Sequence, residues 1–322
     1  MSDRPSVLLH TDDGALALRV LAETHPDLPM RLCESHEGMA RALAESAAEV
    51  VYSVRFAGAA PYPRAALMAA PALRWISVGG SGTDHLRPWD AARLTVTNAA
   101  GVAADMMAEY VLGAMLHFAQ NRHIFAQAQR RGEWLSTGVE PVAGRTVLVI
   151  GLGKTGAAVA RVAKAMGMVV LGCRARPVPM PDVDEVHPVA DLPILLPRAD
   201  YVVCCVPLTE ATRGLLGAAA FAAMKLGAVL VDVSRGGVVS EAALLAALGS
   251  GRLKGAALDV FEREPLPPGN PLWAHQDVLI TPHCSSVYPG WEEASLRIFA
   301  ANLGRYRRGE PLENVVDPVR GY

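Results

Sequence analysis

The sequence predicts an α/β protein of two domains, each built on a parallel sheet. Its 322 residues are about two domains' worth, at ~150 residues per domain. Short apolar runs alternate with alanine-rich helical patterns in both halves of the chain, as they do where strands pair in parallel. One such run leads directly into a glycine-rich turn, Gly151–Gly156, which opens a helical pattern.

The composition limits what the protein can bind. Thirty basic and 32 acidic side chains give a net charge of −2, so no long-range field favours nucleic acid or an anionic membrane. Five cysteines without a CxxC pair predict neither a disulfide framework nor a zinc site, and no other metal cluster is apparent. The N-terminus lacks an apolar signal core, and no uninterrupted stretch of ~20 apolar residues is present. We therefore expect a soluble protein of the reducing cytoplasm.

The first hundred residues predict an α/β unit of their own. We expect strands at Val7–His10, Met30–Cys33, Val50–Ser53 and Trp75–Val78, with helices at Gly14–Thr24 and Arg64–Ala70. The loop Gly79–Asp84 follows the last of these strands, at the carboxyl edge where open α/β sheets bind ligands. Its glycines can expose backbone amides to a small anion such as a carboxylate, and a flexible connector is the alternative interpretation.

A long helix is expected from Val102 to about Arg130. Its apolar positions predict a core helix or a subunit contact. The polar residues on it, Glu109, His117 and His123, are interpreted as packing or surface residues.

The glycine turn is the strongest local pattern in the chain. The buried-strand run Val147–Ile150 precedes Gly151-Leu152-Gly153-Lys154-Thr155-Gly156. In this arrangement Gly151 permits the tight turn, Gly153 admits a pyrophosphate to the backbone, and Gly156 lets the helix pack closely on the strand. The helix N-terminus offers free N–H groups to the anion, so the sequence predicts a dinucleotide site.

Strands and helices alternate again after this turn. We expect strands at Met168–Leu171, Tyr201–Val206, Ala228–Val233, Ala256–Asp259 and Val278–Ile280, and helices at about Gly214–Met224 and Ser240–Leu248. This is the pattern of a Rossmann-type doubly wound sheet. The sequence therefore predicts a dinucleotide-binding domain over 101–283 and a discontinuous substrate domain, 1–100 with 284–322. A last helix from about Tyr288 to Arg308 is expected to pack on that substrate domain.

Three loops at the carboxyl ends of these strands carry groups suited to acid–base chemistry. Arg235 has a planar fork of donors that suits a carboxylate or a polarised carbonyl. His283 can exchange a proton with an alcohol oxygen, and a carboxylate such as Glu264 on its other ring nitrogen would fix its tautomer. Taken singly, a surface cation, a capping residue and a solvated acid are the alternatives.

These motifs resemble one family. GLGKTG, then VPLTEATRG at 206–214, VDVSRGG at 231–237, LDVFEREPLP at 258–267 and TPH at 281–283 are similar to the D-isomer-specific 2-hydroxyacid dehydrogenases, with GSGTDHL at 80–86 resembling their substrate loop. The resemblance implies a flavodoxin-like substrate domain and a homodimer formed through the cofactor domains. It implies that Arg235, Glu264 and His283 are catalytic.

The same resemblance implies binding roles. The amides of Gly80, Ser81 and Gly82 would hold the substrate carboxylate. Asp259 and the Val233 carbonyl would face the nicotinamide, and the adenosine and phosphate region would be lined by Val206, Pro207 and Thr212.

The implied reaction is reduction of a small 2-oxo acid, of the glyoxylate or hydroxypyruvate kind, to the D-2-hydroxy acid. His283 would supply the proton, and Arg235 would stabilise the developing charge. A nucleotide-sensing corepressor on the same fold stays an alternative. A methyltransferase would leave Arg235, Glu264 and His283 unexplained, and formate oxidation would not need a His–Glu pair.

Cofactor choice rests on the end of the strand after the glycine turn. An NAD-binding domain places Asp or Glu there, about 20 residues beyond the glycines. Here Arg174 occupies that place and Arg176 follows, which predicts NADP, with NAD as the alternative cofactor. Arg55 stays open between a pocket role and a surface role, and Trp291 between a pocket wall and the start of the last helix. Cys284 is interpreted as a small packing residue.

Overall fold

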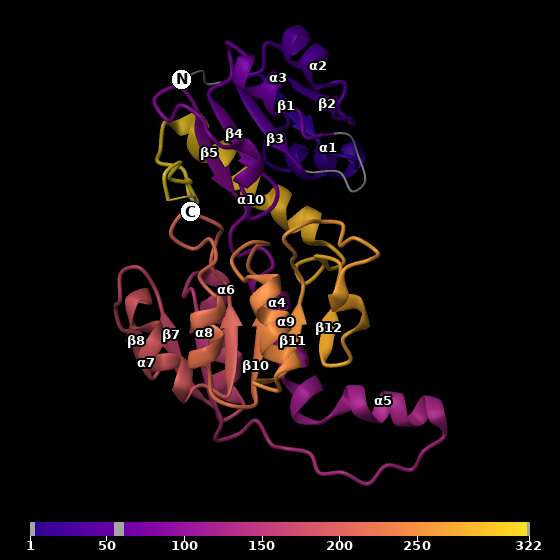
Figure 1. The fold of residues 1–322 in the computed structure, drawn as a ribbon. Helices are drawn as coiled ribbons and strands as arrows, with labels where there is room; N and C mark the ends of the chain where they lie inside the picture. Colours follow the sequence, from indigo (N-terminus) through magenta and orange to yellow (C-terminus); the bar gives the residue numbers. More distant parts are fainter. Residues whose placement is uncertain (1–3, 55–60, 321–322) are drawn as a thin grey trace. The chain divides into compact units, whose positions relative to one another are not determined.

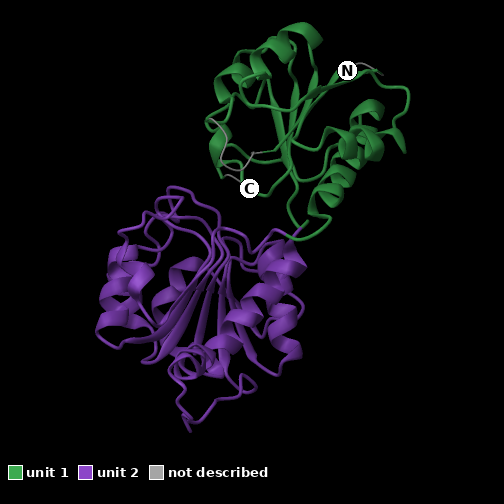
Figure 2. Ribbon diagram, turned by 90° about the vertical axis from the view of Figure 1, so that its right-hand side faces the viewer, with its two compact units in different colours: residues 1–102, 288–322 green, residues 103–287 purple. Residues whose placement is uncertain are grey.

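The computed structural model describes residues 4–54 and 61–320, and the chain divides into two compact units. Unit 1 comprises residues 1–102 and 288–322, and unit 2 comprises 103–287 (Figure 2). Each unit is built on its own sheet, and every strand pairing within the two sheets is parallel. The predicted fold class is confirmed.

Unit 1 has a five-stranded sheet in the order β2-β1-β3-β4-β5, which is the flavodoxin-like order. Its strands are β1 (Val7–His10), β2 (Met30–Cys33), β3 (Val50–Ser53), β4 (Trp75–Val78) and β5 (Thr95–Asn98). The first four lie at the predicted bounds. The sequence does not predict β5, because Thr-Val-Thr-Asn lacks an apolar run. Thr97 is nevertheless fully buried and accepts a hydrogen bond from the Trp75 indole at 2.9 Å.

Two helices cover each face of this sheet (Figure 1). One face carries α1 (Gly14–Ala22) and α10 (Trp291–Arg308), and the other carries α2 (Met39–Ser46) and α3 (Arg64–Ala69). Successive side chains of β1 alternate between the faces, so Val7 and Leu9 pack toward α1 and α10 while Leu8 packs toward α2 and α3. A short 3-10 helix, η1, spans Asp84–Leu86.

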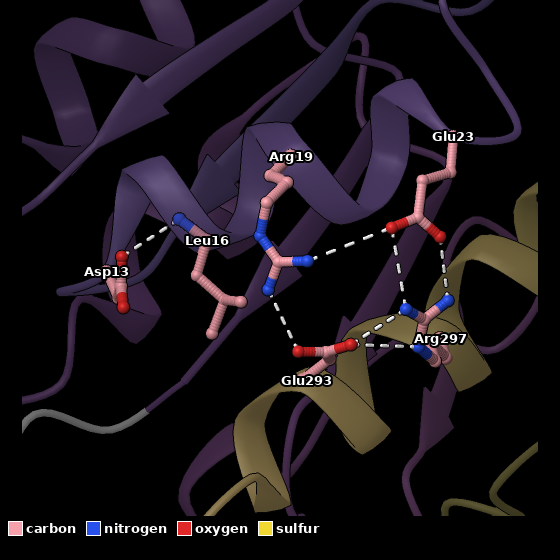
Figure 3. Close-up of polar contacts among 6 residues, drawn as sticks. All are labelled: Asp13, Leu16, Arg19, Glu23, Glu293 and Arg297. Carbon is pink, nitrogen blue, oxygen red and sulfur yellow. Dashed lines mark hydrogen bonds and ion pairs between the residues drawn. The ribbon is translucent and has the colours of Figure 1, made fainter.

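Charged side chains join α1 to α10, two helices far apart in the sequence (Figure 3). Arg19 pairs with Glu293 at 2.9 Å, and Arg297 pairs with both Glu23 at 2.9 Å and Glu293 at 2.7 Å. Exposed ion pairs of this kind contribute little to stability, because solvent screens them. The buried apolar side chains of α10, such as Phe299, therefore contribute most of the free energy that holds the helix to the sheet.

Unit 2 has a seven-stranded sheet in the order β12-β11-β10-β9-β6-β7-β8. Its strands are β6 (Thr146–Ile150), β7 (Val169–Cys173), β8 (Glu185–His187), β9 (Tyr201–Cys204), β10 (Ala228–Asp232), β11 (Leu253–Leu258) and β12 (Val278–Ile280). The chain order reverses between β6 and β9, which is the topological switch point of a Rossmann fold.

Helices cover both faces of this second sheet. One face carries α4 (Ala104–Ala119) and α6 (Lys154–Ala165), and the other carries α7 (Leu192–Leu195), α8 (Ala218–Ala223) and α9 (Glu241–Gly249). Three 3-10 helices connect the elements: η2 (Val189–Asp191), η3 (Leu196–Arg198) and η4 (Pro271–Ala274).

The prediction of a single long helix from Val102 to about Arg130 is wrong. The chain forms α4 and then a separate α5 (Arg122–Arg131), because Asn121 between them adopts a left-handed conformation with φ of 50°. Asn tolerates this conformation more readily than most residues. Figure 1 shows α5 and the segment after it extending from the sheet of unit 2. The Trp134 side chain in that segment is 99% exposed.

No helix within 4–54 and 61–320 combines the length and apolar character needed to cross a membrane.

Candidate active site

The glycine turn joins β6 to α6, and its three glycines meet different surroundings. Gly151 has φ of 100°, and a Cβ on Gly156 would lie 2.0 Å from the Gly151 carbonyl oxygen, so close packing requires both glycines. A Cβ on Gly153 would meet no atom of the described residues within 4 Å. Gly153 is the N-cap of α6, which has no side-chain cap. The turn therefore leaves an open space at an uncapped helix N-terminus, and this space fits a pyrophosphate.

The other residues of the turn are held by unit 2. Leu152 is buried against Gly172 of β7, where a Cβ would lie 2.5 Å from its side chain. Lys154 is the first residue of α6, and the Thr155 hydroxyl lies 3.7 Å from the Met107 sulfur.

The end of β7 lies against this turn. The Gly151 N–H donates to the Cys173 carbonyl at 2.9 Å, and Arg174 follows directly. The Arg174 N–H donates to the His187 carbonyl at 3.0 Å, and its guanidinium contacts the Met180 sulfur at 3.1 Å. Arg176 is exposed two residues further on. Two arginines thus stand at the strand end beside the glycine turn.

The acid on the neighbouring strand is engaged elsewhere. Glu185 of β8 pairs with the Arg198 guanidinium at 2.6 Å and with His187 at 3.0 Å. These hydrogen bonds, that of Arg198 first, lower the pKa of Glu185 to about 2. Its register neighbour in β7 is Leu171, two residues before the strand end. Glu185 is therefore a structural ion-pair partner.

The loop after β9 packs on the glycine turn. A Cβ on Gly151 would lie 2.8 Å from the Val206 side chain, so this valine closes one side of the turn. The Thr212 hydroxyl donates to the Pro207 carbonyl at 2.6 Å and accepts the Thr209 N–H at 2.8 Å. Thr212 thus fixes the conformation of this loop.

The loop after β10 approaches the loop after β11 very closely. A Cβ on Gly236 would lie 1.7 Å from the Phe261 carbonyl oxygen, so no residue with a side chain fits there. Val233 donates its N–H to the Cys204 carbonyl at 3.1 Å, and the Arg235 guanidinium donates to the Ser234 carbonyl at 2.7 Å. Gly236 therefore places Arg235 beside the segment that carries Glu264.

His283 and Glu264 form a pair. His283 Nδ1 lies 2.8 Å from Glu264 Oε2, and the two side chains are 39% and 35% exposed. Glu264 Oε1 accepts the Phe261 N–H at 3.1 Å. Burial acts to raise the pKa of Glu264, but the hydrogen bond and charge of His283, with Phe261 and the Arg235 charge, lower it below the usual value. The structure thus brings Arg235, Glu264 and His283 together at the carboxyl edge of unit 2.

Asp259 supports the loop that contains His283. Its side chain is buried, and its oxygens accept hydrogen bonds from the Thr281 hydroxyl and from the N–H groups of Cys284 and Ser285. The Thr281 hydroxyl also contacts the Tyr110 phenol at 2.8 Å. The sequence does not predict a role for Thr281 or Tyr110, because a helical tyrosine is ordinarily a packing residue and no spacing pattern links it to residue 281.

The loop after β4 in unit 1 presents backbone amides. Its carbonyls at Gly79, Gly80 and Ser81 accept hydrogen bonds from the Ser295 hydroxyl, the Ala99 N–H and the Asn98 side chain, at 2.7, 3.0 and 2.7 Å. Within the described chain, the N–H groups of Gly80, Ser81 and Gly82 meet no acceptor. Three successive amides therefore suit a small anion.

A second group of polar side chains lies at the carboxyl ends of β1 and β3. His10 Nδ1 lies 2.7 Å from the Ser53 hydroxyl, and His10 Nε2 lies 3.0 Å from His36 Nδ1. The Ser53 hydroxyl also contacts the Tyr62 hydroxyl at 2.6 Å. The sequence does not predict this cluster, because its members are scattered through the first 62 residues.

The remaining residues named from the sequence are Trp291, Cys284 and Arg55. Trp291 is the first residue of α10 and packs against the core between α1 and α10. Cys284 contributes its backbone N–H to Asp259. Arg55 lies outside the described residues.

Unit 2 thus combines a Rossmann-type sheet with an arginine and an acid–histidine pair at its carboxyl edge. This combination is typical of dinucleotide-dependent oxidoreductases. Residues 112–285 match the family model "D-isomer specific 2-hydroxyacid dehydrogenase, NAD binding domain". The chain belongs to the D-isomer specific 2-hydroxyacid dehydrogenase family. Unit 2 carries its NAD-binding domain.

Relatives and a solved structure are similar over most of the chain. A glyoxylate reductase of Korarchaeum cryptofilum is 36% identical over 261 residues, covering 77% of each protein. A D-3-phosphoglycerate dehydrogenase of Methanocaldococcus jannaschii is 37% identical over 251 residues, covering 76% of this chain but 48% of that longer protein. The structure of an NADPH-dependent glyoxylate/hydroxypyruvate reductase from Sinorhizobium meliloti, in complex with NADP and sulfate, superposes with a TM-score of 0.83 at 29% identity and covers 98% of this chain and 99% of that one.

Proposed function

We propose that this protein reduces a small 2-oxo acid to the D-2-hydroxy acid, with NADPH as the preferred reductant. The observation that carries the proposal is the His283–Glu264 pair at 2.8 Å, beside Arg235, in the unit whose glycine turn fits a dinucleotide. A nucleotide-binding protein without turnover has no need of an acid-paired histidine next to an arginine.

The residues divide the chemistry between them. The nicotinamide cofactor, when bound, supplies the hydride. His283 Nδ1 is held by Glu264, so Nε2 is the ring nitrogen that delivers a proton to the carbonyl oxygen. Arg235 stabilises the negative charge that develops on that oxygen, and the amides of Gly80, Ser81 and Gly82 bind the substrate carboxylate.

Binding of the cofactor is assigned to residues around the turn. Gly151 through Gly156 and the N-terminus of α6 hold the pyrophosphate, with Val206, Pro207 and Thr212 on the adenosine side. The Val233 carbonyl and Asp259 face the nicotinamide.

Glyoxylate and hydroxypyruvate are the proposed substrates, supported by the relatives named as glyoxylate and glyoxylate/hydroxypyruvate reductases. The test is steady-state reduction of a panel of 2-oxo acids that differ in side-chain length, polarity and charge. We expect kcat/KM to be highest for the small polar members. Tight nucleotide binding with no turnover of any member would instead support the corepressor alternative.

The NADPH preference is a separate proposal. It is supported by Arg174 and Arg176 at the end of β7 and by the engagement of Glu185 with Arg198. A carboxylate at the strand end would repel a 2′-phosphate, whereas a guanidinium binds it.

Arg174→Asp tests this proposal. The variant should lose roughly 10–100-fold in kcat/KM with NADPH, the worth of a charge-assisted hydrogen bond, and little with NADH. Lys154→Ala serves as a control, because loss of a positive charge beside the pyrophosphate should weaken both cofactors alike. Equal efficiencies of the unmodified protein with both cofactors would contradict the preference.

A cytoplasmic homodimer completes the proposal. Support for the dimer comes from the exposed Trp134 on the segment after α5, and the five free cysteines suit a reducing compartment. Sedimentation of the wild type and of Trp134→Ser tests the dimer. A dimeric wild type with a monomeric variant would support a contact through this segment, and a dimer in both would show that the contact lies elsewhere. A monomeric wild type would contradict the proposal.

A further inference from the structure

His283 has a backbone conformation that its neighbours must maintain. Its φ is 52°, in the left-handed region, where a residue with a side chain is strained. Its own N–H donates to the Thr281 carbonyl at 3.0 Å, across a tight turn. Such strain persists only where the surrounding structure holds the residue, so the groups that fix the two flanks of His283 decide where the imidazole points.

The Asp259 carboxylate fixes both flanks. It stands directly after β11 and is 1% exposed. On the side before His283, Oδ1 accepts the Thr281 hydroxyl at 2.6 Å. On the side after it, Oδ1 accepts the Cys284 N–H at 2.8 Å, and Oδ2 accepts the Ser285 N–H at 3.0 Å.

A second element fixes Thr281. The Tyr110 hydroxyl, from α4, lies 2.8 Å from the Thr281 hydroxyl oxygen. Thr281 has one hydroxyl proton, which it donates to Asp259, so Tyr110 must be the donor in this contact. Burial raises the pKa of Tyr110 to about 12, so the phenol keeps its proton throughout the physiological range.

We infer that Tyr110, Thr281 and Asp259 are positioning residues that hold His283 in its left-handed conformation, with Nδ1 on Glu264. The hydrogen bonds run from α4 through the Thr281 hydroxyl to Asp259 at the end of β11, and Asp259 also accepts the main-chain N–H groups of Cys284 and Ser285. The inference rests on the proposed function, because it assigns these residues to the proton-transfer step of that reaction. Tyr110 and Thr281 themselves act only through His283.

The inference predicts a graded effect on turnover. Tyr110→Phe removes one hydroxyl and one hydrogen bond and should lower kcat roughly 3–10-fold, the net worth of such a bond. Thr281→Val also removes the donor to Asp259 and should lower kcat roughly 10–100-fold. Thr281→Ser keeps the hydroxyl and should retain most of the wild-type kcat. The KM for NADPH should stay within a factor of about two in all three, since small changes at separate sites leave binding intact.

Tyr201→Phe is the matched control. Tyr201 is a buried tyrosine of unit 2 at the amino end of β9, whereas the candidate site lies at the carboxyl ends of the strands. Loss of its hydroxyl should leave kcat unchanged. The double variant Tyr110→Phe/Thr281→Val should be no slower than Thr281→Val alone, because both changes act through one hydroxyl. Multiplied losses in the double variant would overturn the inference.

Crystal structures of the wild type and of Thr281→Val supply a readout that does not depend on turnover. We expect His283 to leave the left-handed region, or Nδ1 to move beyond hydrogen-bond distance of Glu264, in the variant only. An unchanged His283 in Thr281→Val would overturn the inference even if kcat fell. If the wild type reduced no 2-oxo acid, the proposed function would fail, while the crystal structures would still decide whether these residues hold His283.

Discussion

The carboxyl edges of the two sheets each carry a histidine, and the two histidines have opposite surroundings. His283 in unit 2 has a carboxylate on Nδ1 at 2.8 Å and is 39% exposed. His10 in unit 1 is fully buried, with the Ser53 hydroxyl on Nδ1 and a second histidine, His36, on Nε2. Burial and the charge of His36 lower the pKa of His10 to about 3, although its hydrogen bond with Ser35 opposes them.

This difference separates a group that can transfer protons from a group that cannot. His10 stays neutral throughout the physiological range, so its ring serves as a fixed hydrogen-bonding spacer between β1, β3 and the segment after β2. His283 has the acid partner and solvent access that proton exchange requires. A histidine at a strand end therefore indicates chemistry only when its partners and exposure are known.

The largest expected effect comes from replacing His283, and the same kind of replacement at His10 serves as the comparison. His283→Gln should lower kcat by roughly 10²–10⁴-fold, the usual contribution of general acid–base catalysis, with nucleotide affinity unchanged. His10→Asn keeps an acceptor near Ser53 and should change kcat little. Parallel kinetics and nucleotide titrations of the two variants check this, and equal losses of kcat would remove the distinction between the two edges.

Arg235→Ala should have the next largest effect. The guanidinium is proposed to bind the substrate in the ground state and to stabilise the oxyanion, so both KM and kcat should worsen. Loss of charge-assisted hydrogen bonds predicts roughly 10–100-fold in kcat/KM or more. Arg235→Lys, which keeps the charge but not the planar fork, should recover part of this loss. An unchanged KM and kcat in Arg235→Ala would contradict the assignment.

Local composition predicted much of this fold. Apolar runs such as Val50–Ser53 and Val147–Ile150 are buried on both faces, so their burial is visible in the residues themselves. The strand Thr95–Asn98 was not predictable in this way, because its buried Thr97 is satisfied by a hydrogen bond from Trp75 in another strand. The break at Asn121 depends on one backbone angle that composition does not determine.

The site shows the same division. Arg235, Glu264 and His283 stand out because each follows a strand of one sheet, and parallel strands end at one edge. The contacts of Tyr110 with Thr281 and of Gly236 with Phe261 join segments 171 and 25 residues apart through tertiary packing. Such contacts depend on distances across the fold, which spacing in the sequence does not encode.

The buried state of His10 predicts a loss of stability in acid. Its pKa falls from an ordinary 6.5 to about 3 on folding, so the unfolded chain binds more protons between these values. The free energy of unfolding should therefore decrease as pH falls from 6.5 toward 3, by about 2 kcal/mol between pH 7 and pH 5 from this residue. Urea unfolding of wild type and His10→Asn at both pH values measures the difference. The same pH dependence in both proteins would show that His10 is not buried in its neutral form.

The smallest effect should come from Asp232, a buried acid at the end of β10 in unit 2. Burial and the neighbouring Asp259 raise its pKa from 3.8 to about 7, against the opposing hydrogen bonds of Ser234 and the charge of Arg235. The folded state thus holds a proton that the unfolded chain has lost, so stability should decrease as pH rises from about 4 to about 7 and then level off. Between pH 6 and pH 8 this residue should cost about 1 kcal/mol.

Asp232→Asn isolates that contribution, because the amide oxygen can still accept the Ser234 N–H and hydroxyl that Asp232 Oδ1 accepts at 3.0 and 2.5 Å. The variant should lose less stability than the wild type when urea unfolding is measured at pH 6 and again at pH 8. Kinetics at pH 6 should stay close to those of the wild type, since a protonated Asp232 and an asparagine are both neutral behind Arg235. An identical pH dependence of unfolding in the two proteins would mean that Asp232 is ionised in the folded state. Asp232 would then be charged in the folded protein although it is buried, in contrast to His10, which burial keeps neutral.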